Sequence, residues 1–134
     1  MIVVETSALI AILLDEPEAP RFRVAIEEAD RRVLSAVSLL ETGIVMRARQ
    51  GPQAITALDD YLTRAMVEVA FFDRIQAGIA IAAFDRYGKG IDPAARLNFG
   101  DCASYALAKS LNAPLLFKGD DFTATDVRSA ISSA

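Results

Sequence analysis

Short runs of apolar, mostly β-branched residues alternate with longer helical segments along this 134-residue chain. Runs this short suit strands buried on both faces of a sheet rather than helices. Strands that alternate with helices build a parallel sheet whose two faces are covered by those helices. We therefore predict a single α/β domain over residues 1–134, with a short parallel sheet of four or five strands flanked by helices on both faces. Strands are expected at residues 2–5, 32–36, 67–71 and 114–117.

Residues that favour helix starts precede several of the expected helices. Ser7, Asp73 and Asn98 are each expected to cap the helix that follows them. Ser38 and Glu41 have the spacing of a capping box, in which the glutamate bonds back to the start of its own helix. The helices are expected at residues 8–14, 21–29, 38–50, 52–65, 74–87 and 99–110.

The chain contains no histidine, which removes whole classes of catalytic chemistry. Imidazole acid–base catalysis, Ser-His and Cys-His nucleophiles and His-ligated metal sites are all excluded. The net charge of −4 argues against a protein that grips nucleic acid by phosphate attraction alone. It leaves room for a protein that reaches phosphate through bound metal ions. An enzyme of this composition would have to work with carboxylates, lysines and metals.

The single cysteine, Cys102, rules out an internal disulfide and fits a reducing compartment. The longest uninterrupted apolar run, residues 8–14, is far shorter than the ~20 residues that a membrane-spanning helix needs. No charged leader with a cleavage site precedes this run. We therefore expect a cytoplasmic protein without a membrane partner.

A glutamate, Glu5, stands at the end of the first expected strand, between apolar residues and the pair Thr6-Ser7. A buried carboxylate is costly unless it is paired, protonated or bound to a cation. Glu5 therefore predicts a partner elsewhere in the chain.

Further acids fall where the predicted fold would bring them to Glu5. Glu41 and Asp101 lie in what we expect to be first turns of helices, and Asp120 and Asp121 follow the last strand. Helix starts after a strand lie at the same edge of the sheet as strand ends, where sites form in such folds. Taken singly, Glu41 and Asp101 are as easily explained as helix-start residues, and Asp120-Asp121 more easily as a turn. Several carboxylates on one edge indicate a site for a hard cation, Mg²⁺ or Mn²⁺.

Four stretches of the sequence resemble the PIN-domain ribonucleases of the VapC toxin type. They are VVETSALIAILLDEP, SAVSLLETGIV, NFGDCASYALAKS and PLLFKGDDFTATDV, in the family's order. The resemblance implies a toxin of a type II toxin–antitoxin pair, a metal-dependent endoribonuclease neutralised by a VapB-type antitoxin. It also implies a homodimer, an RNA substrate, and contact with operator DNA only through the antitoxin. The family's acidic quartet falls on Glu5, Glu41, Asp101 and Asp121, with Asp120 at a variable position.

Glu5 departs from the family, which has aspartate at this position before Thr-Ser. The extra methylene moves the carboxylate by about 1.5 Å, one carbon–carbon bond. Mg²⁺ demands regular geometry, so this displacement can shift the ion or expel it, and activity can be attenuated. We predict Glu5 and Asp101 as metal ligands, with Mg²⁺ as the ion and Mn²⁺ as an alternative.

Other residues are expected to support the site. Thr6 and Ser7 are predicted to orient the ligands by hydrogen bonds, although helix capping explains Ser7 equally well. Lys89, Arg96 and Lys118 lie on expected loops and are hypothesised to contact substrate phosphates, against the alternative that they are simply solvated. The aromatic residues Phe71, Phe72, Phe84 and Phe99 are expected in the core.

Two other functions remain in competition. A catalytically silent protein with the PIN fold would act through its antitoxin on operator DNA, and Glu5 is the feature that favours it. A receiver-like signalling domain would also be a parallel α/β domain with acids and Mg²⁺. The receiver needs a phospho-acceptor aspartate at the end of strand three, where this chain has Ala70-Phe71-Phe72.

Overall fold

The computed structural model describes residues 1–131 and contains one parallel sheet of four strands, in the order β3-β2-β1-β4. All three neighbouring pairs are parallel, so the predicted α/β architecture is confirmed with four strands rather than five. The strands are β1 (Ile2–Val4), β2 (Arg32–Ser35), β3 (Val67–Ala70) and β4 (Leu115–Leu116).

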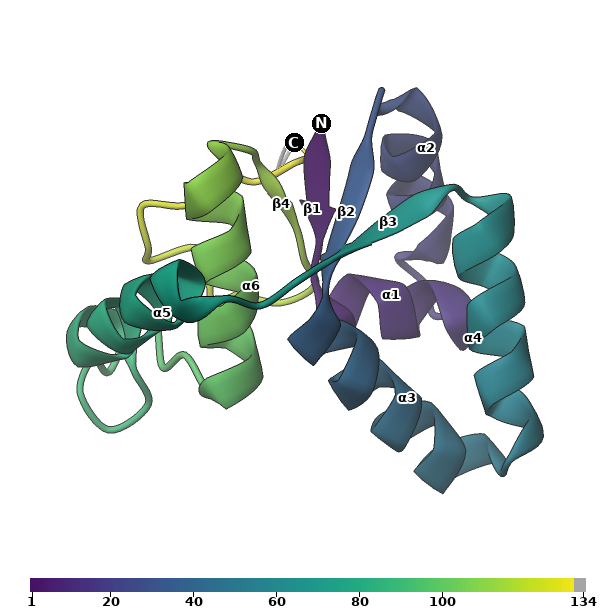
Figure 1. Ribbon diagram of the computed structural model, residues 1–134, viewed down its shortest axis with the longest axis horizontal. Coiled ribbons are helices and arrows are strands. Elements are labelled where there is room, and N and C mark those ends of the chain that lie inside the picture. Colours follow the sequence, from purple (N-terminus) through teal and green to yellow (C-terminus); the bar gives the residue numbers. More distant parts are fainter. Residues whose placement is uncertain (132–134) are drawn as a thin grey trace.

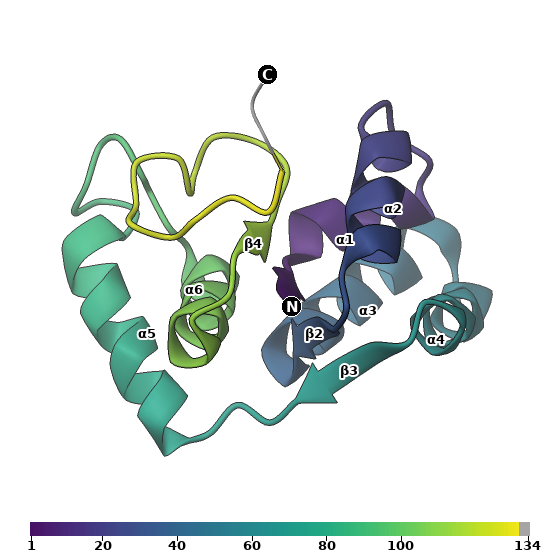
Figure 2. The same ribbon diagram turned by 90° about the horizontal axis from the view of Figure 1, so that it is seen from above.

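Helices cover both faces of this sheet, as predicted. Figure 2 shows α5 and α6 on one side of the strands and α1, α2 and α4 on the other. Helix α3 contacts α1 and α4 as well as α6, and extends below the strands in Figure 1. The helices are α1 (Thr6–Leu13), α2 (Ala19–Glu28), α3 (Ala36–Gln50), α4 (Gln53–Arg64), α5 (Arg74–Tyr87) and α6 (Phe99–Leu111).

The direction of the chain across the sheet reverses at β1. The first three strands follow one another outward, from β1 to β2 to β3, and β4 then pairs with the opposite side of β1. Such a reversal separates the connections on the two sides and leaves a crevice at the carboxyl ends of the strands. The sheet therefore favours a site where β1 and β4 end.

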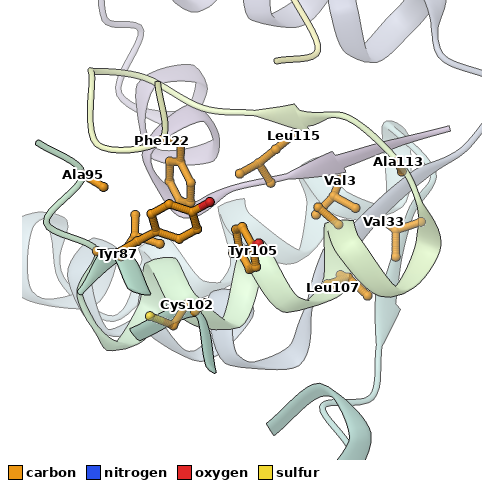
Figure 3. Close-up of a cluster of buried hydrophobic side chains, with 13 residues drawn as sticks. Val3, Val33, Tyr87, Ala95, Cys102, Tyr105, Leu107, Ala113, Leu115 and Phe122 are labelled. Carbon is orange, nitrogen blue, oxygen red and sulfur yellow. The ribbon is translucent and has the colours of Figure 1, made fainter. Parts of the chain in front are cut away.

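Alternating strand residues supply two cores, because successive side chains point to opposite faces of a sheet. Val3 and Val33 pack on the α5–α6 side with Tyr87, Tyr105 and Leu107, as Figure 3 shows. On the other side of the sheet the buried cluster contains Val4, Leu34, Leu9, Phe22 and Leu58.

Two predicted helix starts are wrong. Helix α1 begins at Thr6 with Glu5 as its N-cap, so Ser7 is not the cap. Helix α3 begins at Ala36, because the side chain of Ser35 at the end of β2 accepts a hydrogen bond from the Val37 N–H. Ser38 and Glu41 thus lie inside the helix and form no capping box there, and Glu41 is in the second turn rather than the first.

The Ser38 hydroxyl has a different partner. Its Oγ lies 2.8 Å from the Oγ of Ser104, and both serines are buried. This hydrogen bond joins α3 to α6. By contrast, the predicted caps Asp73 of α5 and Asn98 of α6 are confirmed.

The prediction that the phenylalanines are core residues is wrong for three of them. Phe71 is 91% exposed, Phe99 81% and Phe84 41%. With Phe72, Ile81 and neighbouring small residues, Phe84 and Phe99 line an apolar groove of about 460 Å³, the α5–α6 groove. A second apolar groove, the α3–α4 groove, has a volume of about 350 Å³ and is lined by Leu39, Leu40, Gly43, Ile44, Arg47, Ile55 and Leu58.

None of the helices within residues 1–131 combines the length and the apolar character needed to cross a membrane.

Candidate metal site at the carboxyl edge of the sheet

Glu5 follows β1 directly, at the carboxyl edge of the sheet where β1 pairs with β4. Its backbone N–H donates to the Leu116 carbonyl at 2.9 Å, which continues the pairing of β1 with β4. Its carboxylate caps α1, because Oε2 accepts hydrogen bonds from the Ser7 N–H at 2.8 Å and from the Ser7 hydroxyl. The residue is only 3% exposed. Because β1 leads into α1 without an intervening loop, the residue that ends the strand is also the one that caps the helix.

Ser7 ties this carboxylate to the loop that follows β4. While its hydroxyl donates to Glu5, its Oγ accepts from the Lys118 N–H at 2.9 Å. The predicted orienting contact of Ser7 with Glu5 is therefore present in the structure. The neighbouring Thr6 makes no such contact: it is buried, and its Oγ1 has no hydrogen-bond partner among the described residues.

Asp101 approaches from the start of α6. Its Oδ2 accepts from the Asn98 N–H at 3.0 Å, while the Asn98 side chain accepts from the Asp101 N–H, so the two form a capping box. Asp101 is 8% exposed, and burial raises its pKa to about 6. The negative charges of Asp121 and Glu41 raise the pKa of Asp101 further, against the opposing effect of the hydrogen bond from the Asn98 N–H.

Glu5 is perturbed in the same direction. Burial raises its pKa to about 7, and the charges of Asp101 and Glu41 add to that effect, while hydrogen bonds from Ser7 oppose it. The four predicted acids, which come from four separate stretches of the chain, thus lie close enough at this edge to act on one another electrostatically.

Glu41 and Asp121 complete the group from less buried positions. Glu41 is half-buried on α3, and its carboxylate lies against Gly100 of α6. Asp121 and its neighbour Asp120 are exposed in the loop after β4. The edge therefore has a buried pair of acids, Glu5 and Asp101, flanked by two more accessible ones.

The predicted substrate-contacting cations differ in their surroundings. Lys118 pairs with Glu16 at 3.1 Å and Glu18 at 3.0 Å, so its ammonium holds the loop after β4 against the turn between α1 and α2. Lys89 and Arg96 are exposed in the loop that leads into α6. Contact of these three cations with a substrate stays a prediction.

The residues at this edge suit a hard divalent cation by their chemistry. All four side chains offer carboxylate oxygens, which Mg²⁺ and Mn²⁺ prefer. Glu5 and Asp101 are buried and have raised pKa values, so their negative charges are not fully stabilised by the protein. A bound cation would stabilise them. Within residues 1–131, no three acidic or cysteine side chains lie close enough together to form a ready-made metal site. Side-chain adjustment is therefore part of any binding here.

Sequence reasoning missed two contributors to this edge. The pairing of Lys118 with Glu16 and Glu18 joins residues about a hundred positions apart, which no local pattern reveals. The contact between Gly100 and Glu41 likewise depends on how α3 packs against α6. The one available signal was Gly100 itself, since a glycine in the first turn of a helix is unfavourable without a packing reason.

Comparison with known proteins gives a consistent result. The model of the PIN domain matches residues 2–128. Ribonuclease VapC30 of Mycobacterium tuberculosis is 49% identical over 125 residues, which cover 93% of this chain and 95% of that protein. Ribonuclease VapC of Mycolicibacterium smegmatis is 48% identical over 125 residues, covering 93% and 96%.

Solved structures match the fold at lower identity. VapC20 of Mycobacterium tuberculosis, a Sarcin-Ricin loop cleaving toxin, superimposes with a TM-score of 0.78 at 18% identity, over 95% of this chain and 96% of that one. VapBC2 from Rickettsia felis, bound to a DNA fragment from its promoter, gives 0.72 at 16% identity, over 96% of both chains. FitAcB from Neisseria gonorrhoeae gives 0.69 at 20% identity, also over 96% of both.

The raised pKa of Glu5 predicts a pH-dependent stability in chelator. Between the unfolded value of 4.5 and the folded value of about 7, the folded chain keeps a proton that the unfolded chain releases, so stability falls as pH rises through this window. Glutamine is neutral at all these pH values, so a Glu5→Gln variant avoids the cost of burying a charge. It should be more stable than the parent at pH 8, by up to about 3 kcal/mol, and the difference should be much smaller at pH 4.5. Urea denaturation at both pH values measures the difference. A stability difference that does not change with pH would contradict the burial of a titrating Glu5.

Proposed function

This chain belongs to the PIN domain family, and within it to the VapC ribonucleases, and we propose that it is the toxin of a type II toxin–antitoxin pair, acting as a metal-dependent endoribonuclease. The relatives named as ribonucleases are matched over nearly their whole length, so the likeness covers the whole domain and not one motif. VapBC2 and FitAcB have the same fold as this chain.

One observation carries the proposal most directly. Glu5 and Asp101 are both buried at the carboxyl edge of the sheet with raised pKa values, and the charges of Glu41 and Asp121 contribute to these shifts. Buried carboxylates with raised pKa values are expected at sites where a bound ligand stabilises their charged forms. A divalent cation is the ligand that a group of oxygen donors selects.

We propose that Glu5 and Asp101 hold the ion, Mg²⁺ or alternatively Mn²⁺. The chemistry that such an ion supplies when bound is a lowered pKa of water and stabilisation of charge on the scissile phosphate. Ser7 keeps the Glu5 carboxylate in place, and the Asn98 N–H does the same for Asp101. Glu41 and Asp121 add negative charge at the rim, while Lys89 and Arg96 are available to RNA phosphates. Water as nucleophile leaves a 5′-phosphate and a 3′-hydroxyl.

The first test is Asp101→Asn. The amide oxygen can still accept from the Asn98 N–H, and a buried charge is removed, so the melting temperature should be unchanged or higher. RNA cleavage in Mg²⁺ should fall by more than about 100-fold, the upper range for losing a residue that only supports a metal ligand. Asp120→Asn, which makes the same charge change at an exposed neighbour of Asp121, is the control and should cut normally. Equal cleavage by the parent and Asp101→Asn would remove Asp101 from the site.

Glu5→Asp tests whether the extra methylene attenuates the enzyme. Aspartate is itself a favoured N-cap, so the shorter side chain should still cap α1. The shorter carboxyl also withdraws from the negative charge of Asp101, which raises the pKa of Glu5, and leaves room for an ion. We expect tighter Mg²⁺ binding and faster cleavage, with Mn²⁺ rescuing the parent more than the variant. A variant that loses stability and gains neither binding nor activity would mean that Glu5 acts only as a cap.

The same comparison separates the silent-protein alternative from the enzyme. A parent that cuts no RNA in Mn²⁺, and a Glu5→Asp variant that also cuts none, would favour the silent reading. A receiver domain is not favoured, since β3 ends at Ala70 without an acid and the matched relatives are ribonucleases.

We further propose that the protein works in the cytoplasm, as a homodimer and with a VapB-type antitoxin that alone contacts operator DNA. Exposed apolar side chains along the α3–α4 and α5–α6 grooves support two partner surfaces. In the α3–α4 groove, Leu40 and Ile44 are exposed, and Leu40 directly precedes Glu41 in the chain, so we expect a segment bound there to reach the acids. An antitoxin arginine reaching that edge would neutralise the acids. The α5–α6 groove is then left for the second copy.

Single charges test this assignment. Ile44→Glu should abolish co-purification with the antitoxin and leave the dimer intact, whereas Ile81→Glu should give a monomer that still binds antitoxin. Both residues are exposed, so neither change should unfold the protein. Size-exclusion chromatography with light scattering measures the oligomeric state. Co-expression with the small protein encoded next to this one, which we expect to be the antitoxin, measures antitoxin binding. Exchanged outcomes would reverse the assignment, and no effect from either would refute both surfaces.

A further inference from the structure

Gly100 occupies a position where its own backbone does not require glycine. It is the second residue of α6 and is buried, and its φ lies outside the left-handed region. Alanine would normally be preferred in such a helix, because glycine loses more conformational freedom on folding. The glycine therefore has another physical reason.

The reason is the carboxylate of Glu41. A Cβ added to Gly100 would lie 2.5 Å from Oε1, 2.7 Å from Oε2 and 2.8 Å from Cδ of Glu41, and these are the three nearest atoms. The conflict is thus with one carboxylate and not with the backbone of α3. The two other helical glycines within residues 1–131 differ: a Cβ at Gly43 makes ordinary contacts at 3.7 and 3.9 Å, and a Cβ at Gly78 meets nothing within 4 Å.

We propose that Gly100 is a positioning residue for the acidic site: its missing side chain provides the space in which the Glu41 carboxylate lies beside Asp101. This inference rests on the proposed metal-dependent function. It adds that the site also requires a residue without a side chain at position 100 of α6. Gly100 acts only through Glu41, whose carboxylate adds negative charge near the ion that Glu5 and Asp101 would hold.

The two helix backbones are held more firmly than the Glu41 side chain. Helix α6 starts with the Asn98–Asp101 capping box, and the buried hydrogen bond between Ser38 and Ser104 fixes α3 against it. A glutamate side chain, by contrast, can change rotamer at small cost. A methyl group at position 100 should therefore leave the fold in place and turn the Glu41 carboxylate away from Asp101 and Glu5.

The consequence is a change in metal binding without a loss of folding. Gly100→Ala should weaken Mn²⁺ binding by about 10-fold, the lower range for residues that support a metal site. Its melting temperature should stay the same or rise. Gly78→Ala is the matched control, since it makes the same change in an exposed helix with free space around it. It should keep the parent's Mn²⁺ affinity and cleavage rate.

A double-mutant cycle with Glu41→Ala decides whether the effect passes through Glu41. With Glu41 shortened, position 100 has room, so adding Gly100→Ala should change Mn²⁺ affinity by less than about twofold. Isothermal titration calorimetry with Mn²⁺ and thermal melts in chelator are measured on the parent, the three single variants and the double variant.

Each outcome bears on the proposal. Parent-like Mn²⁺ affinity in Gly100→Ala, or an equal further loss in the Glu41→Ala background, would overturn it, as would a parent that binds no Mn²⁺. Should Gly100→Ala melt lower, recovery in the double variant supports the conflict with Glu41, and a persistent loss overturns it. A parent that binds Mn²⁺ but cuts no RNA would refute the ribonuclease while leaving this inference standing.

Discussion

Burial of the Glu5 carboxyl at the end of the central strand is the constraint on which the arrangement of this edge depends. Removing a carboxylate from water is costly, and the acids that surround Glu5 increase the cost. Two hydrogen bonds from Ser7 offset part of it. Since Ser7 also accepts from the Lys118 N–H, the same hydroxyl joins β1, α1 and the loop after β4. The buried carboxyl thus lies where hydrogen bonds through Ser7 connect three segments of the chain.

The topology of the sheet explains how acids from distant parts of the chain meet. Because β4 pairs with β1 on the side opposite β2, the helices α3 and α6 come from different sides and converge below the strand ends. Glu41 and Asp101 are carried there by these two helices, and Asp121 by the loop after β4. No one element holds more than one of the four acids, so small changes in helix packing alter the spacing of the group.

The sequence was sufficient for those features that depend on local pattern. The strands, the order of elements and the capping role of Asn98 follow from periodicity and residue type, and the acids could be assigned to one edge because helix starts and strand ends coincide there. Local pattern failed where a nearer residue competed: Ser35 caps α3 before Ser38 can. It failed again for Phe71 and Phe99, since hydrophobicity alone does not say whether an apolar side chain faces the core or a partner. The ion pairs of Lys118 and the space at Gly100 depend on tertiary contacts and had no local signature.

The hydrogen bond between Ser38 and Ser104 sets the alignment of two helices rather than the strength of their contact. The two hydroxyls are buried away from water, and one donates to the other across the helix interface. A slide of α3 along α6 by one turn would break this hydrogen bond, whereas a pair of alanines would favour no single position. The bond therefore selects one registration of the helices among nearly equivalent packings. It thereby fixes the position of Glu41 on α3 relative to Asp101 on α6, while contributing little to the strength of the contact between the helices.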